Sequence, residues 1–234
     1  MGSKNRYAKY ILPIILKNRQ PNQYFVDLFC GGANIVDKVD GNRIANDINY
    51  YLIQTFIAGK NGWIPPEIIT EEDYKNIKNN KDNFPSELVG YVGFSMSFGG
   101  KWFGGYRRDK AGDFSLENMR KQSIRSKNSF INQINNLKDV IFYNKNYWEV
   151  EIPENSILYL DPPYFSTTGY GNKFNHEQFW QWSEEMVNKG HKVFVSEYHS
   201  PESPWIEIWA KKVFSSLTKN TSSKVAVEKL FTVI

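Results

Sequence analysis

The sequence is poor in the residues that build disulfide-stapled, zinc-binding or membrane-spanning proteins. It has one cysteine in 234 residues, which excludes a disulfide framework and a cysteine-rich zinc site and favours a reducing compartment. Its three histidines, His176, His191 and His199, lack metal-ligand spacing, so no metal is expected. There is no apolar run of about 18 residues and no signal-peptide pattern. These absences predict a soluble, intracellular protein without a membrane partner.

The composition that is present fits a globular protein able to meet nucleic acid. An apolar content of 41% over 234 residues is enough for one core, or for a core with an inserted lobe. Aromatic residues reach 16%, and the net charge of +4 is a mild basic excess. Such a charge permits a nucleic-acid partner without requiring one.

The most informative stretch is an apolar run followed by an acid, two prolines and an aromatic. Ile157–Leu160 is typical of a buried parallel strand, although so short a run can also be helical. Neither Pro162 nor Pro163 can donate an N–H, and Pro163 favours an extended Pro162. The Asp161 carboxylate, the Pro162 carbonyl and the Tyr164 ring could then hold a flat, amine-bearing group by its edge and its face. The alternative is a tight turn with Tyr164 in the core.

Two earlier segments predict strands that end at ligand-binding residues. The strand at 24–29 leads into Gly31 and Gly32, which allow the backbone to approach a ligand at the switch point of an α/β sheet. The strand at 43–47 ends in Asp47, which is placed to accept hydrogen bonds from a ribose. The absence of a Gly-x-Gly-x-x-Gly pattern and of a P-loop lysine favours a nucleoside without phosphates, such as S-adenosylmethionine (AdoMet). Cys30 has no basic partner and is expected to pack beside the turn.

Residues 59–136 interrupt the α/β alternation. Helices are expected from Thr70 and over 119–137, and residues 87–94 are apolar. Residues 98–114 combine paired glycines, aromatics and cations, which favours a β-hairpin that touches nucleic acid, with a solvated loop as the alternative. Cations of the following helix could contact phosphates or line a solvated face. The candidate DNA contacts are Lys101, Trp102, Arg107, Arg108, Lys110, Arg120, Lys121 and Arg125.

The remaining chain resumes the α/β pattern. A polar loop at 165–173 is suited to closing over a substrate, and Asn175 with Gln178 predicts a helix start. The last two strands predict an antiparallel hairpin with its turn at 219–223. In total seven strands are expected, at residues 24–29, 43–47, 140–143, 157–160, 192–197, 212–217 and 224–233.

Taken in order, these motifs resemble the Dam-type, or α-group, DNA adenine-N6 methyltransferases of phages and restriction–modification systems. Phe25–Gly32 resembles the AdoMet motif of that family, Asn46–Ile48 its ribose motif, and Asp161–Tyr164 its catalytic tetrapeptide. Gly2–Lys4 is similar to an N-terminal Gly-x-Lys element, and Asn146–Tyr147 lies where the family places a pair beside the adenine of AdoMet. The resemblance implies cofactor contacts at Lys4, Asp27, Phe29, Cys30, Gly31, Gly32, Asp47, Ile48, Asn146, Tyr147 and Asp161.

The expected hairpin matches the family only in part. Residues 107–114 resemble the Arg-x-Asn-x-x-Gly-x-aromatic segment that reads GATC, but Asp109 stands where the family has Asn. Residues 116–118 replace the Pro-aromatic-Gly that normally follows. Asp109 joins the candidate DNA contacts, and the target sequence is left open.

The resemblance implies a Rossmann-like AdoMet-dependent methyltransferase whose catalytic domain spans 1–58 and 137–234, with a mainly helical target-recognition domain at 59–136. It implies methyl transfer to an adenine flipped out of double-stranded DNA. Tyr164 would stack on the base, while Asp161 and Pro162 would accept its amine hydrogens. The protein is expected in the cytoplasm of a bacterial or phage-infected cell, as a monomer in solution that could form a dimer on DNA.

Three alternatives stay open. An RNA base amino-methyltransferase shares the tetrapeptide, but the insert argues against it. A cytosine-N4 methyltransferase more often begins the tetrapeptide with Ser. A DNA-binding module that kept the fold without activity would not need the complete set of acid, prolines and tyrosine.

Overall fold

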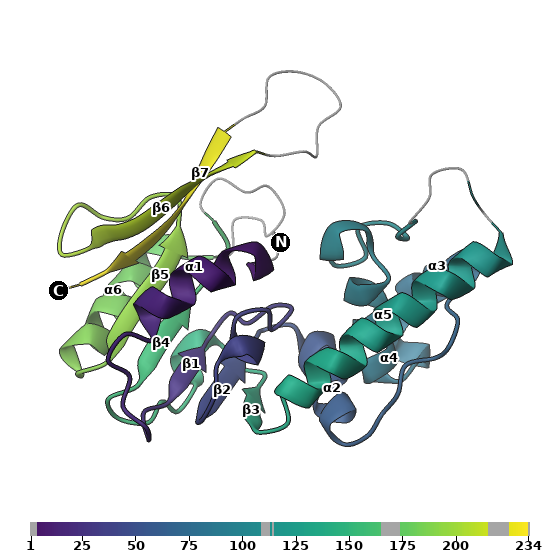
Figure 1. Cartoon of the computed structure of the whole chain (residues 1–234), viewed down its shortest axis with the longest axis horizontal. Coiled ribbons are helices and arrows are strands. Elements are labelled where there is room, and N and C mark those ends of the chain that lie inside the picture. Colours follow the sequence, from purple (N-terminus) through teal and green to yellow (C-terminus); the bar gives the residue numbers. More distant parts are fainter. Residues whose placement is uncertain (1–3, 109–112, 114, 165–173, 215–224, 234) are drawn as a thin grey trace.

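The computed structural model describes residues 4–108, 113, 115–164, 174–214 and 225–233 (Figure 1). Within these residues one sheet of seven strands has the order β3-β2-β1-β4-β5-β7-β6. The strands are β1 (Phe25–Asp27), β2 (Arg43–Asn46), β3 (Val140–Tyr143), β4 (Ile157–Leu160), β5 (Lys192–Glu197), β6 (Ile206–Phe214) and β7 (Val225–Thr232).

The sheet confirms the predicted fold class. β1 to β5 are mutually parallel, whereas β7 runs antiparallel to both β5 and β6. The strand order reverses between β1 and β4, whose register pairs Asp27 with Tyr159. Because the carboxyl ends of neighbouring parallel strands meet at one edge, residues that follow β1 and β4 come together there, which is where open α/β sheets bind ligands.

The two faces of the sheet are covered by different helices. Successive residues of β4 point to opposite faces, so Tyr159 joins the cluster beneath α1 (Asn5–Ile15) and Leu158 joins the cluster beneath α6 (His176–Asn188). All four residues of β4 are buried, which explains why its sequence is apolar without alternation. α6 begins as predicted, because Asn175 Oδ1 accepts the Gln178 N–H at 3.0 Å.

The inserted lobe is helical and stands beyond the β3 edge of the sheet (Figure 1). Its helices are α3 (Glu71–Asn79), α4 (Ser86–Ser95) and α5 (Leu116–Asn136), with short 3₁₀ turns at Lys81–Asn83 (η2) and Phe98–Gly100 (η3). Thr70 and Asp73 form the capping box that begins α3. The lobe packs on α2 (Tyr50–Lys60), and a single apolar cluster continues from the α1 face of the sheet into the lobe. The proposed boundary at 58/59 falls inside α2, and the two-domain division stays a prediction.

The β-hairpin expected at 98–114 does not form in the part of it that is described. An isolated antiparallel bridge joins Ser97 and Tyr106, but residues 98–108 contain no strand. The paired glycines Gly99 and Gly100 both have positive φ and make a tight turn, and Trp102 packs inward on α2 and α4. Residues 109–112 and 114 lie outside the described residues.

The C-terminal hairpin is confirmed, but β6 is longer than predicted. It begins at Ile206 instead of Lys212. Ile206, Ile208 and Ala210 alternate with Glu207 and Lys211, but Trp209 and a shift in register between Glu207 and Trp209 interrupt the pattern, and the sequence analysis overlooked it. The predicted turn at 219–223 and the polar loop at 165–173 lie outside the described residues. Among the helices that are described, none is long and apolar enough to cross a membrane.

Candidate active site

The tetrapeptide Asp161–Tyr164 leaves the carboxyl end of β4, as predicted. Its acid meets a cation from the other end of the sequence: Lys4 Nζ, at the start of α1, lies 3.2 Å from Asp161 Oδ1. The same ammonium lies 4.5 Å from the centroid of the Tyr164 ring. It also donates hydrogen bonds to the Tyr164 hydroxyl and to Glu228 of β7. The predicted residues Lys4, Asp161 and Tyr164 therefore form one cluster.

Burial and neighbouring charges tune the acid of this cluster. Burial raises the pKa of Asp161 to about 6, against the lowering effect of the Lys4 ammonium and with the help of the Glu228 carboxylate. Burial works against the Lys4 charge, but the two carboxylates outweigh it and hold the pKa of Lys4 above its ordinary value. Burial also raises the pKa of Tyr164, which stays a phenol. At neutral pH the cluster holds a carboxylate acceptor beside a neutral aromatic ring.

The glycine turn lies beside this cluster. Asp27 ends β1, is 1% exposed, and its Oδ1 has no hydrogen-bond partner among the described residues. Burial raises the pKa of Asp27 well above its ordinary value, and the charge of Asp161 raises it further. A buried acceptor without a partner costs about 1–3 kcal/mol. A ligand that brings a cationic or N–H group to this oxygen would remove that cost.

Asp47 is held by backbone donors at the end of β2. Its carboxylate accepts the Gly31 N–H at 3.0 Å and the Asn49 N–H at 2.8 Å. These bonds join the glycine turn to the end of β2, and Asn46 ties the same region to Leu28 through a 3.1 Å bond. Each carboxylate oxygen keeps a second lone pair for a hydroxyl group.

The remaining predicted cofactor residues differ in exposure. Ile48 follows Asp47 and is 65% exposed, which leaves an open apolar surface. Tyr147, by contrast, is buried in the short turn η4 (Tyr147–Glu149), where its ring lies 5.2 Å from that of Phe29. Asn146 caps this turn through Glu149. Tyr147 therefore packs against the ring of Phe29. Direct contacts of Asn146 and Tyr147 with a cofactor stay predictions.

These residues fit AdoMet. The charge of Asp161 raises the pKa of Asp27, and these two acids provide a site for a positively charged ligand. Asp47 offers oxygens to a ribose, and Ile48 and Phe29 offer apolar surface to a base. Cys30 is buried, and burial raises the pKa of its thiol, so it packs beside the turn as expected. No group of acids, histidines and cysteine in the described residues could hold a metal ion.

Glu228 was not anticipated from the sequence. It is 6% exposed on β7 and contacts both Lys4 and Tyr164. One signal could have revealed it: in the predicted strand, period-two alternation places Glu228 on the same face as the buried Leu230. A carboxylate on the buried face of a strand needs a partner.

The candidate DNA contacts lie on the lobe, and several make ion pairs there. Arg108 pairs with Glu71 at 2.6 Å and Arg120 with Glu67 at 2.5 Å, while Lys121 pairs with Glu117 on the same helix. Lys101 and Arg125 are exposed and Arg107 is half-buried. The Trp102 ring is stacked on that of Tyr51 of α2, with the ring centroids 5.7 Å apart, where the lobe packs on this helix. Asp109 and Lys110 lie outside the described residues, and DNA contact by this set stays a prediction.

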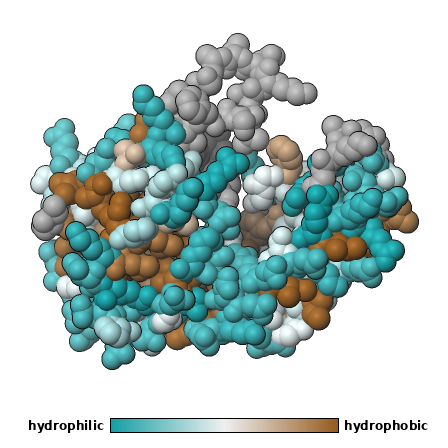
Figure 2. All heavy atoms as spheres, in the orientation of Figure 1, coloured by the Kyte–Doolittle hydropathy of each residue, from teal (hydrophilic) through white to brown (hydrophobic). Residues whose placement is uncertain are grey.

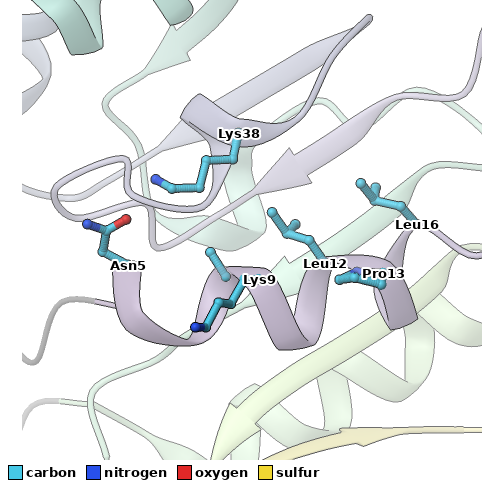
Figure 3. Close-up of a pocket in the computed structure, with 7 residues that line it drawn as sticks. Asn5, Lys9, Leu12, Pro13, Leu16 and Lys38 are labelled. Carbon is cyan, nitrogen blue, oxygen red and sulfur yellow. The ribbon is translucent and has the colours of Figure 1, made fainter.

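Two hollows mark the surface. In Figure 2 the surface is hollowed between the sheet and the inserted lobe. A groove of about 410 Å³ runs along α1 and is lined by Asn5, Ala8, Lys9, Leu12, Pro13, Leu16 and Lys38. Figure 3 shows its lining residues. The groove along α1 contains none of the predicted site residues, and its lining combines four apolar residues with Asn5, Lys9 and Lys38.

The sheet order and the site at its switch point define a Rossmann-like AdoMet-dependent methyltransferase. A family model described as D12 class N6 adenine-specific DNA methyltransferase matches residues 1–98 and 102–225. The chain belongs to this family.

Two curated relatives are similar to the chain. Modification methylase StsI from Streptococcus sanguinis is 28% identical over 198 residues, which are 74% of this chain and 29% of the relative. Type II methyltransferase M.FokI from Planomicrobium okeanokoites is 25% identical over 198 residues, 75% of this chain and 30% of the relative. The chain thus spans less than a third of the length of either relative.

Among solved structures, the rRNA methyltransferase aviRa from Streptomyces viridochromogenes matches with a TM-score of 0.45 and 10% identity. The match covers 100% of this chain and 85% of that one.

Proposed function

We propose that this chain transfers the methyl group of AdoMet to the N6 amine of an adenine flipped out of a specific site in duplex DNA. The observation that carries the proposal is the meeting of Asp161 and Tyr164 with Lys4 at the edge of the sheet where Asp27 has a buried oxygen without a partner. At that edge, Tyr164 and Asp161 offer a ring and a hydrogen-bond acceptor to the amine-bearing base. The acids beside the glycine turn offer carboxylates to the positively charged AdoMet. Membership of the D12 class supports adenine as the base.

The protein's part in the reaction is to position the base and to accept its amine hydrogens. Bound AdoMet supplies an electrophilic methyl group on a sulfonium. The Tyr164 ring stacks on the extruded base, and the Asp161 carboxylate and Pro162 carbonyl accept the two N6–H groups. These acceptors would direct the nitrogen lone pair toward the methyl group that AdoMet supplies, and the Asp161 carboxylate would take up the proton that the N6 amine loses. No covalent protein nucleophile is required.

The DNA is proposed to lie across the hollow between sheet and lobe. Flipping a base costs a few kcal/mol of unstacking and unpairing, which contacts to the surrounding duplex must offset. Arg107, Arg108 and the cations of α5 would make those contacts, and residues 59–136 would act as the recognition domain. We further propose a cytoplasmic monomer that could form a dimer on DNA, and a modification role like that named for its relatives.

The test is methyl transfer from radiolabelled AdoMet to unmethylated duplex DNA, with RNA of the same sequence in parallel and Asp161→Ala as the blank. Analysis of the modified nucleoside is expected to give N6-methyladenine. Transfer to RNA alone would support an RNA amino-methyltransferase, and N4-methylcytosine would move the assignment to that class. AdoMet binding without transfer to either polymer would support a non-catalytic module. Sequencing the methylated DNA of cells that express the chain would then report the target site.

A further inference from the structure

The buried carboxylate of Glu228 belongs to neither the tetrapeptide nor the glycine turn, yet it lies at the centre of the site. It comes from β7, the strand between β5 and β6. Its partners are the Lys4 ammonium and the Tyr164 hydroxyl. The neighbouring Lys229 pairs instead with Glu207 at 2.8 Å, so the two adjacent charges of β7 make separate contacts.

The hydrogen bonds of this cluster have a defined direction. An ammonium has three donors, and Lys4 has three oxygen acceptors within reach: Asp161 Oδ1, Glu228 Oε1 and the Tyr164 hydroxyl. Because that hydroxyl accepts from Lys4, it can donate its own hydrogen to Glu228. Glu228 is therefore the acceptor at which the hydrogen bonds from Lys4 and Tyr164 both end.

Removing Glu228 would redistribute these contacts. Lys4 would keep one carboxylate partner, Asp161, whose oxygens are the acceptors that the proposed reaction needs for the target amine. The Tyr164 hydroxyl would lose its hydrogen bond to Glu228, which is one of the contacts that orient its ring. Both changes would act on the two groups that hold the base.

We propose that Glu228 is a positioning residue: it shares the Lys4 ammonium with Asp161 and anchors the Tyr164 hydroxyl, so that acceptor and ring are held ready for the flipped base. The inference rests on the proposed function and extends it to a residue outside the family motifs named above. Other titratable or charged groups around this cluster come from four elements: Tyr7 of α1, Asp27 of β1, Tyr159 of β4, and Glu197 and Tyr198 at the end of β5. Lys211 of β6 is paired with Glu228 in the strand register, but its ammonium lies 3.7 Å from the centroid of the Tyr10 ring.

The test uses Glu228→Gln and Glu228→Asp, with Glu207→Gln as the matched control, because it removes one acid from the same hairpin without touching the cluster. Single-turnover methyl transfer is measured against pH with both substrates saturating. For Glu228→Gln the plateau rate is expected to fall about tenfold to a hundredfold, as for a misplaced reacting group. The acidic limb of its pH–rate profile is expected to move about one pH unit lower, because a negative charge near Asp161 is lost. Glu228→Asp keeps that charge, so its acidic limb is expected at the same pH as in the parent although its plateau rate falls. Glu207→Gln is expected to match the parent in both the plateau rate and the position of the limb.

Two results would overturn the inference. One is a Glu228→Gln enzyme with the rate and the limb of the parent. The other is a slower enzyme whose limb does not move, since loss of structure alone predicts that outcome. A substrate-free measurement separates this inference from the proposed function: the carboxyl ¹³C resonance of Asp161, followed by NMR, is expected to titrate at lower pH in Glu228→Gln than in the parent. That shift is expected even if DNA is not the substrate, and its absence would count against Glu228 in either case.

Discussion

At the scale of single residues, Asp161 is the group on which the proposed reaction depends most. Asp161→Ala removes the acceptor carboxylate, and we expect methyl transfer to fall below detection. The Asp27 and Asp47 carboxylates are unchanged, so AdoMet binding by calorimetric titration is expected to stay measurable. A variant with parental turnover would remove Asp161 from the mechanism.

The pKa of the same residue predicts a pH dependence. Burial raises the pKa of Asp161 to about 6, and the ionised carboxylate is a stronger hydrogen-bond acceptor for the target amine than the protonated acid. The rate is therefore expected to be constant above this pH and to fall about tenfold for each pH unit below it. Single-turnover rates between pH 5 and pH 8 would show this limb, and Asp161→Asn should lack it. A limb that persists in Asp161→Asn would belong to another group.

As pH rises, ionisation of Asp161 is expected to increase the rate but to lower the stability of the folded protein. The folded protein binds a proton at Asp161 more tightly than the unfolded chain, so stability is lost as pH rises from the ordinary pKa of 3.8 toward 6. Asp161→Asn is therefore expected to raise the melting temperature more at pH 8 than at pH 5, as measured by calorimetry. An equal change in melting temperature at both pH values would show that burial does not raise the pKa of Asp161.

At the scale of elements, α2 and α4 pack tightly against each other where the inserted lobe meets the rest of the chain. A Cβ atom at Gly90 would lie 2.1 Å from the carbonyl oxygen of Tyr51 and 2.2 Å from Thr55 Oγ1. Gly90→Ala is expected to lower the free energy of unfolding by about 1–3 kcal/mol or more. Ser129→Ala, at an exposed position of α5, is the control and is expected to stay within about 0.5 kcal/mol of the parent. Denaturant titration of both variants would decide.

The elements also show how far the sequence alone reaches. β3, β4 and β5 begin and end at the predicted residues, because each is a short run rich in apolar residues whose pattern is visible locally. The start of β6 and the turn at 98–108 were predicted wrongly. In the first case alternation was hidden among charges; in the second, aromatics expected to face DNA pack against α2 and α4.

The site could be predicted only where a motif is contiguous. Asp161, Tyr164 and Asp27 are found by their position at strand ends. Glu228 is not, since its partner Lys4 lies 224 residues away in the sequence. A pairing over that distance is decided by the order of the strands, which no local pattern contains.

At the scale of the whole molecule, recognition is expected to be separable from cofactor binding. Arg107→Ala or Arg108→Ala is expected to weaken binding to target DNA by about 1–3 kcal/mol and to leave AdoMet affinity unchanged. Lys78→Ala, an exposed cation of α3 outside the predicted contacts, is the control. Fluorescence anisotropy with target and random duplexes would measure both. If either arginine variant binds the two duplexes as the parent does, that arginine has no reading role.

The salt link between Lys4 and Glu228 also has a consequence for biosynthesis. Glu228 follows Tyr164 by 64 residues and lies on the penultimate strand of the sheet order, β7. When translation has passed Tyr164 but has not reached Glu228, the nascent chain contains every family motif named above but lacks the acid that completes the cluster. On the proposed role of Glu228, the cluster that holds the base is therefore complete only after β7 has paired with β5.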